Sequence, residues 1–183
     1  MNVLHPQEKI IKTYTYNEIN VDLVEWSDTI WCGKAGYADN NTDEPDVEKI
    51  MEDFMSISAT PNSREDHWDI CMSLNYLSNE CPSGVMFGFL VESDAQPDPY
   101  DIVRVSSARF LRIRMCDETA RALGHEPWMG GVPPYQWIGE QIAPQLGYTY
   151  GSDALPIVEY YGFFSPEAGK HEYCYLYVPV KEK

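Results

Sequence analysis

One acidic residue interrupts an apolar stretch near the C-terminus. Glu159 stands in LPIVEYYGFF (155–164), between residues that otherwise read as a buried strand. An ionised carboxylate buried without a partner costs several kcal/mol, or its pKa rises until it protonates. Two explanations stay open. Glu159 either forms an internal salt bridge with Arg112 or Arg114 of FLRIRM (110–115), or it binds a cationic or hydrogen-bonding ligand held against aromatic rings.

Tyrosines recur at alternate positions in HEYCYLYVPV (171–180). Tyr173, Tyr175 and Tyr177 share one face of this predicted strand, because successive side chains of a strand point to opposite faces. The short SPEAGK connection predicts a hairpin with the strand that carries Glu159, but pleating leaves open whether the tyrosines lie on the face of Glu159. This aromatic row fits either a surface that holds a flat apolar molecule or ordinary packing.

Other combinations of reactive residues are weaker. His67, Trp68 and Asp69 are adjacent in a predicted strand, so the histidine and the aspartate face opposite ways and form no dyad. The five cysteines contain no CxxC pair, and the histidines lack zinc-ligand spacing. We therefore predict no metal and no cofactor, and we expect reduced thiols.

Charge and hydropathy exclude several classes of partner. The 183 residues contain 29 acidic and 13 basic side chains, for a net charge of -16, which repels nucleic acid and anionic membrane surfaces. No stretch approaches the roughly 20 apolar residues of a membrane span, and the N-terminus lacks an apolar export segment. These features predict a soluble cytoplasmic protein that binds neither nucleic acid nor membranes directly.

The predicted elements occur in the same order twice. Each half reads as a strand, a helix and two further strands, which predicts one α+β domain of tandem β-α-β-β units. Half one covers about 21–93 and half two about 102–181, with 1–20 as an N-terminal extension and DAQPDPYD (94–101) as the linker. The predicted strands are 29–38, 67–77, 84–93, 106–115, 155–164 and 171–180.

The first of the two predicted helices shows clear apolar periodicity, whereas the second is less regular, with Ile138, Ile142 and Leu146 four residues apart. In the first, predicted over Pro45–Ser56, a core-facing stripe recurs at i, i+3, i+4, i+7 and i+8: Val47, Ile50, Met51, Phe54 and Met55. The second is predicted over Pro134–Ala143. Pro144 lacks an N–H and clashes one turn back, so we expect a kink or an end near Ala143.

Three motifs carry a family resemblance: CGKAGY (32–37), the P-x-x-E-Y strand from Pro156 to Tyr160, and the closing YLYVPVK (175–181). Over about 21–181 the sequence resembles the GyrI-like family. These are effector-binding domains of AraC-type transcription regulators, related to the drug-binding domain of BmrR. The resemblance implies one curved antiparallel sheet backed by two main helices, and an acidic residue that contacts small ligands, often cationic and aromatic.

The resemblance also suggests site residues. Glu159 matches the position of the family's acid, and Trp31, Trp68, Trp137 and Tyr161 are carried over as ligand-facing aromatics, with Tyr173 and Tyr175 as further candidates. No helix-turn-helix pattern precedes the domain, so the sequence resembles stand-alone members.

Three classes of function follow from these observations. The first is a protein that senses or sequesters a small amphipathic molecule. The second, implied by the resemblance, is a hydrolase of strained cyclopropane-type genotoxic compounds, in which Glu159 activates water and a nearby tyrosine, with Tyr161 as the candidate, or a histidine supplies a proton. The third is an interaction protein whose partner is a transcription regulator or gyrase. The sequence identifies neither the ligand nor the oligomeric state.

Overall fold

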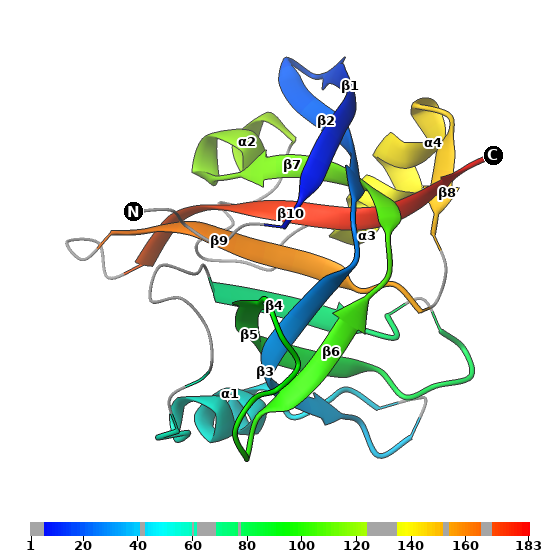
Figure 1. Cartoon of the computed structure of the whole chain (residues 1–183). Coiled ribbons are helices and arrows are strands. Elements are labelled where there is room, and N and C mark those ends of the chain that lie inside the picture. Colours follow the sequence, from blue (N-terminus) through cyan, green and yellow to red (C-terminus); the bar gives the residue numbers. More distant parts are fainter. Residues whose placement is uncertain are drawn as a thin grey trace.

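A computed structural model describes residues 6–40, 43–59, 61, 69–76, 78–123, 135–151, 154–165 and 170–183. Ten strands form one antiparallel sheet in the order β1-β2-β7-β10-β9-β4-β5-β3-β6, and β8 pairs with β10 (Figure 1). The strands are β1 Glu8–Tyr16, β2 Ile19–Trp26, β3 Thr29–Tyr37, β4 Asp69–Leu74, β5 Gly84–Val91, β6 Asp101–Val105, β7 Ala108–Met115, β8 Tyr148–Tyr150, β9 Ile157–Ser165 and β10 Lys170–Glu182.

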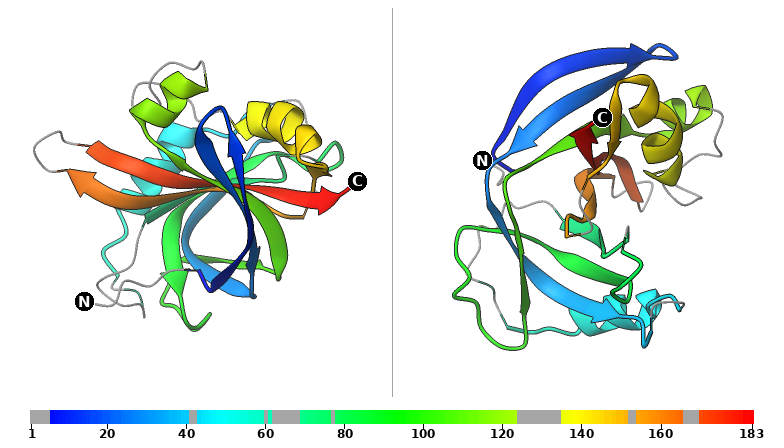
Figure 2. Two further views of the ribbon diagram at one scale, coloured as in Figure 1. Left: turned by 90° about the horizontal axis from the view of Figure 1, so that it is seen from above. Right: turned by 90° about the vertical axis from the view of Figure 1, so that its right-hand side faces the viewer.

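Two long stretches of chain hold the ends of this sheet together. β2 runs into β3, and β6 runs into β7, each after only two intervening residues. Because β2 pairs with β7 while β3 pairs with β6, the sheet bends strongly on itself (Figure 2). Its inner face encloses an aromatic core, in which the rings of Trp26, Trp31, Phe110, Tyr160 and Tyr177 are at most 2% exposed.

The helices lie on the opposite face of the sheet. α1 (Val47–Met55) packs on β3 and β5. On the other side of the sheet's centre, α2 (Asp117–Ala122) contacts β7, and a continuous run of α3 (Tyr135–Trp137), η2 (Ile138–Ile142) and α4 (Ala143–Gln145) packs on β10 and β8. Both helical regions therefore cover one face of a curved antiparallel sheet, as predicted (Figure 2, right).

The predicted strands and both helices are present with ends shifted by a few residues. The order β3-α1-β4-β5 returns as β7, the α3-η2-α4 helix, β9 and β10. The elements not predicted are β1, β2, β6, β8 and α2. The predicted extension at 1–20 thus contains most of a hairpin, whose turn residues Asn17 and Glu18 both have positive φ.

The second helix runs through Pro144 and ends at Gln145, although the proline has no N–H to donate. The turn before it widens to a π-helix, in which the N–H of Ala143 donates to the carbonyl of Ile138. A π turn removes the conflict between the proline ring and the preceding turn. The helix then ends at Gln145, and Gly147 follows at a φ of 91° that favours glycine.

The prediction for the buried face of α1 was wrong in part. Ile50 is buried and Phe54 is half-buried, but Val47, Met51 and Met55 are 44%, 46% and 76% exposed. Ile50 lies against Gly36 of β3, where an added Cβ would come within 2.5 Å of the isoleucine. The helix packs on the sheet through Ile50 and Phe54, and the flank with Val47, Met51 and Met55 stays outside the core.

Candidate functional site

Glu159 lies in the middle of the helix-bearing face. On β9 it is directly opposite Cys71 of β4 and Leu176 of β10, and Cys71 is opposite Phe87 of β5. Directly opposed residues point to the same face, so these four side chains form one row across the sheet. α1 covers one end of the row from above β3 and β5, whereas the α3-η2-α4 helix covers the other end.

The carboxylate of Glu159 is 7% exposed and has neutral hydrogen-bond partners. The phenol of Tyr161, two residues along the same face of β9, donates to one of its oxygens. A second phenol, that of Tyr135 at the start of α3, also hydrogen-bonds to it. Among the described side chains no cation forms an ion pair with Glu159.

This environment moves the proton affinity of Glu159 into the physiological range. Burial raises its pKa to about 7, and the hydrogen bonds from Tyr161 and Tyr135 oppose that rise only in part. Burial also raises the pKa of the Cys71 and Cys174 thiols well above the usual value, and the charge of Glu159 adds to the effect. Among the described groups at this site, Glu159 is therefore the one that titrates near neutral pH.

A close packing arrangement holds Tyr135 in place. The phenol of Tyr150 donates to the backbone carbonyl of Tyr135 at 3.1 Å. Gly139 makes room for this, because a Cβ there would lie 1.9 Å from the ring of Tyr150. The ring of Tyr76 meets that of Tyr135 edge-on, with the centroids 5.7 Å apart. Gly139 of the second helix, Tyr150 of β8 and Tyr76 in the turn after β4 thus position one hydrogen-bond donor to Glu159.

The two arginines considered as partners of Glu159 lie on the other face. Arg112 forms ion pairs with Glu8 and with Asp22, the latter at 2.7 Å. Its guanidinium lies 4.9 Å from the ring centroid of Tyr175, and that of Arg114 lies 4.3 Å from the ring centroid of Tyr173. The salt-bridge explanation for Glu159 is therefore wrong for both arginines.

The structure brings together only some of the residues predicted for the ligand site. Tyr161 adjoins Glu159, and Trp137 is half-buried on the same face, where its ring meets that of Tyr16. Trp31, which is 0% exposed and donates to Thr29, lies on the inner face, as do Tyr173 and Tyr175, which flank the arginines. Trp68 lies outside the described residues. The ligand-binding role of each remains a prediction.

Two neighbours of Glu159 were missed in the sequence. Cys71 is fixed by strand register, which a single sequence does not reveal. Tyr135 follows Pro133-Pro134 at the start of the helix, and that proline pair was a detectable signal for a residue placed at a helix entry.

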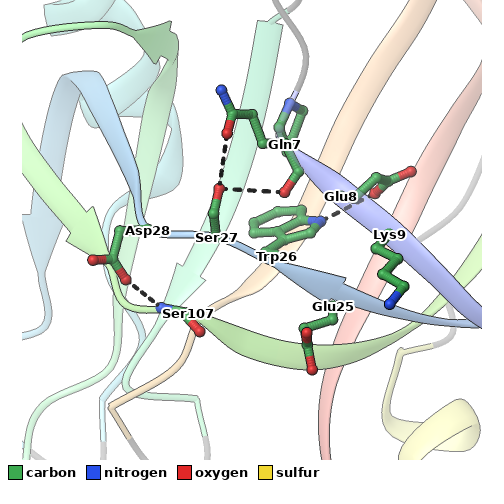
Figure 3. Close-up of a pocket in the computed structure, with 9 residues that line it drawn as sticks. Gln7, Glu8, Lys9, Glu25, Trp26, Ser27, Asp28 and Ser107 are labelled. Atoms are coloured by element: carbon green, nitrogen blue, oxygen red, sulfur yellow. Dashed lines mark hydrogen bonds between the residues drawn. The ribbon is translucent and has the colours of Figure 1, made fainter.

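A separate recess of about 820 Å³ lies where β1 begins (Figure 3). Its lining includes Glu8, Trp26, Ser27 and Ser107. The carboxylate of Glu8 already accepts hydrogen bonds from Trp26 at 3.1 Å and from Tyr177 at 3.0 Å, besides its ion pair with Arg112. Because Trp26 is 1% exposed, the recess offers little aromatic surface, and the buried chemistry of Glu159 makes the better candidate site.

Within the described ranges, no group of three or more His, Cys, Asp or Glu side chains is placed to hold a metal ion. None of the helices in the described part of the chain is long and apolar enough to cross a membrane.

No family model matches the sequence, and no curated protein matches it. Three of the solved structures that share the fold serve as examples. SAV2435 bound to tetraphenylphosphonium has a TM-score of 0.56 at 12% identity, covering 88% of this chain and 93% of that one. A putative bacterial transcription regulation protein from Staphylococcus aureus MU50 has a TM-score of 0.53 at 13% sequence identity, and the match covers 89% of this chain and 99% of that one. The EcmrR C-terminal domain has a TM-score of 0.52 at 10% sequence identity, and the match covers 90% of this chain and 99% of that one. The chain thus has the fold of the GyrI-like effector-binding domains, as the sequence resemblance predicted.

Proposed function

We propose that this chain binds a small amphipathic cation at Glu159 and thereby senses or sequesters it. The observation that carries the proposal is a carboxylate that is 7% exposed and has phenols, not cations, as its described partners. Such a group is poorly stabilised when ionised, so a ligand that brings a positive charge gains from neutralising it.

The surroundings favour a ligand with an apolar, polarisable body. Tyr135 and Tyr161 present rings near the carboxylate, and Tyr76 packs on the ring of Tyr135. Cys71 and Phe87 continue the row that contains Glu159. Cation-π contact adds about 1–2 kcal/mol for each desolvated ring. A small cation that is strongly hydrated would lose water without gaining these contacts. The fold neighbour SAV2435, solved with tetraphenylphosphonium bound, supports a ligand of the lipophilic cation class.

A charge-deletion experiment tests the proposal. N-methylquinolinium and its neutral near-isostere 1-methylnaphthalene are titrated by calorimetry against the wild type and against Glu159→Gln, which keeps the volume and removes the charge. We expect the cation to lose about 1.5–3 kcal/mol of binding free energy, as for one charge-assisted contact, and the neutral compound to lose far less.

Glu118→Gln is the matched control, because it removes one exposed carboxylate on α2 and changes the net charge equally. Equal losses for both ligands in Glu159→Gln, or an equal loss of the cation in Glu118→Gln, would contradict the proposal.

Hydrolysis of a strained electrophile is the second candidate function. It is favoured by the pKa of Glu159, since a carboxylate with a pKa of about 7 is a competent general base at neutral pH. However, burial and the charge of Glu159 strongly raise the pKa of Tyr161, which makes this phenol a poor proton donor. Binding without turnover is therefore the better supported function, and a turnover assay separates the two.

A further inference from the structure

The exposed flank of α1 carries a ridge of three apolar side chains, which we call the α1 ridge: Val47, Met51 and Met55. They are spaced four residues apart and are therefore neighbours along one side of the helix. Exposed apolar side chains in contact with one another on a helix mark a surface that binds something apolar more often than scattered ones do. Methionine adapts its shape to varied partners.

The side of the sheet toward which the α1 ridge points can be worked out from the other flank of α1, which carries Asp53. Asp53 and Ser56 line a recess with Lys34 and with Pro99, which follows the end of β5 and precedes β6. That flank of α1 therefore faces the β3-β6 side of the sheet. Residues advance by 100° along a helix, so Met51 and Asp53 point about 160° apart. The α1 ridge consequently faces the other way, over β5 and toward β4 and β9.

The sheet beneath the ridge leads to Glu159. Val85 and Phe87 of β5 are half-buried on the helix-bearing face, and Cys71 lies between Phe87 and Glu159. Adjacent strands lie about 4.8 Å apart, so Phe87 is roughly 10 Å from Glu159 across the sheet. Cys71 and Phe87 thus lie between the carboxylate and the part of the sheet on which α1 packs.

We infer that the α1 ridge is the apolar end of the Glu159 site, and that the ligand is an elongated amphipathic cation. Its charged head binds at Glu159, and its apolar tail lies across Phe87 against Met51 and Met55. This inference rests on the proposed function. A tail that reaches the ridge buries methylene groups, each of which strengthens binding roughly threefold to fourfold.

A series of N-methyl-, N-butyl- and N-octylquinolinium ions tests the inference, because the head is constant and only the tail grows. Calorimetric titration of the wild type should give dissociation constants that fall with tail length. In Met51→Gln/Met55→Gln, which keeps side-chain length and helix propensity, we expect the ratio of the N-methyl to the N-octyl constant to fall by about tenfold or more. The N-methyl ion should bind nearly as before.

Ile10→Thr/Ile11→Thr is the matched control, since these residues of β1 are 51% and 41% exposed and lie away from α1. An unchanged length dependence in the methionine variant, or an equal loss in the isoleucine variant, would overturn the inference. If Glu159→Gln still weakens the N-methyl ion, the proposed function survives that outcome. If no quinolinium ion binds the wild type, the proposed function and this inference fail together.

Discussion

Tyr161 and Glu159 lie two residues apart on the same face of β9, and the phenol donates its hydrogen bond to the carboxylate. A hydrogen bond to the charged form of an acid lowers the pKa of that acid. Burial acts in the opposite direction and is the larger effect, so the pKa of Glu159 is raised to about 7 in spite of Tyr161. The charge of this site therefore depends on small changes around one carboxylate.

Tyr161→Phe should move the pH dependence of cation binding. In the wild type we expect binding about tenfold weaker at pH 6 than at pH 8, because the neutral acid must lose its proton to pair with the ligand. Loss of the phenol should raise the pKa of Glu159 further, by roughly one pH unit, and shift the midpoint of binding upward. Titrations of N-methylquinolinium from pH 5.5 to pH 9 measure the midpoint.

Tyr173→Phe removes a phenol from the opposite face and should leave that midpoint unchanged. A shift of the same size in both variants would mean that Tyr161 does not act on Glu159 directly.

Glu159 should also make the protein less stable as the pH rises. Its pKa is about 7 in the folded chain and near 4.5 when unfolded, so the folded state binds the proton more tightly. Stability from this group is then fully present below pH 4.5, falls between pH 4.5 and pH 7, and stays low above pH 7. The whole effect is about 3 kcal/mol.

Urea unfolding of the wild type and of Glu159→Gln at pH 5, 6, 7 and 8 measures this effect. Relative to the wild type, the glutamine variant should gain stability as the pH rises. Cys71, Cys174, Tyr135 and Tyr161 face the same carboxylate, and their raised pKa values keep them protonated throughout this range. A constant difference between the two proteins across the series would show that Glu159 does not titrate there.

The sheet and both main helices could be predicted because their residues alternate or recur with clear periods. β1 could not, since a bulge between Ile10 and Lys12 breaks the alternation that identifies a strand. β6 was hidden by the proline-rich segment before it, which reads as a linker. Part of the α1 stripe stays outside the core because a helix on a sheet buries only the line of residues that touches it, and periodicity does not show the width of that line.

The candidate site was predictable only at its centre. Glu159 stands out because a charge within an apolar run needs an explanation, and Tyr161 shares its face by simple alternation. Neither the face of the Tyr173 row nor the nearness of Cys71 could be predicted, because both depend on the register between strands distant in sequence. Likewise, the sequence does not reveal that Arg112 pairs with Glu8 and Asp22 instead of Glu159, because these residues are brought together by strand pairing.

The ion pairs of Arg112 should stabilise the fold far more than those of Arg109. Glu8, Asp22 and Arg112 have side chains only 18%, 17% and 15% exposed, so Arg112→Met leaves two poorly hydrated carboxylates without their cation. We expect a loss of about 2–4 kcal/mol in the free energy of unfolding. Arg109→Met is the matched control. This arginine is 43% exposed and pairs with Glu25 and Glu182 at the surface, where solvent screens the charges, so its loss should cost much less than the loss of Arg112. Similar losses in the two variants would contradict the assignment.

Gly139 should be the most restrictive position in the second helix, and its substitution should reach Glu159 through Tyr150 and Tyr135. Alanine normally stabilises a helix relative to glycine by about 1 kcal/mol. Here its Cβ would overlap the ring of Tyr150, whose phenol holds the carbonyl of Tyr135. We expect Gly139→Ala to lower the free energy of unfolding by about 1–3 kcal/mol. It should also weaken N-methylquinolinium binding, because a displaced Tyr135 no longer supports the carboxylate.

A double-mutant cycle with Tyr150→Ala isolates the overlap, since the smaller residue frees the space for the new Cβ. In that background Gly139→Ala should be neutral or stabilising, and a loss as large as in the wild type would show that Tyr150 is not what requires glycine at position 139.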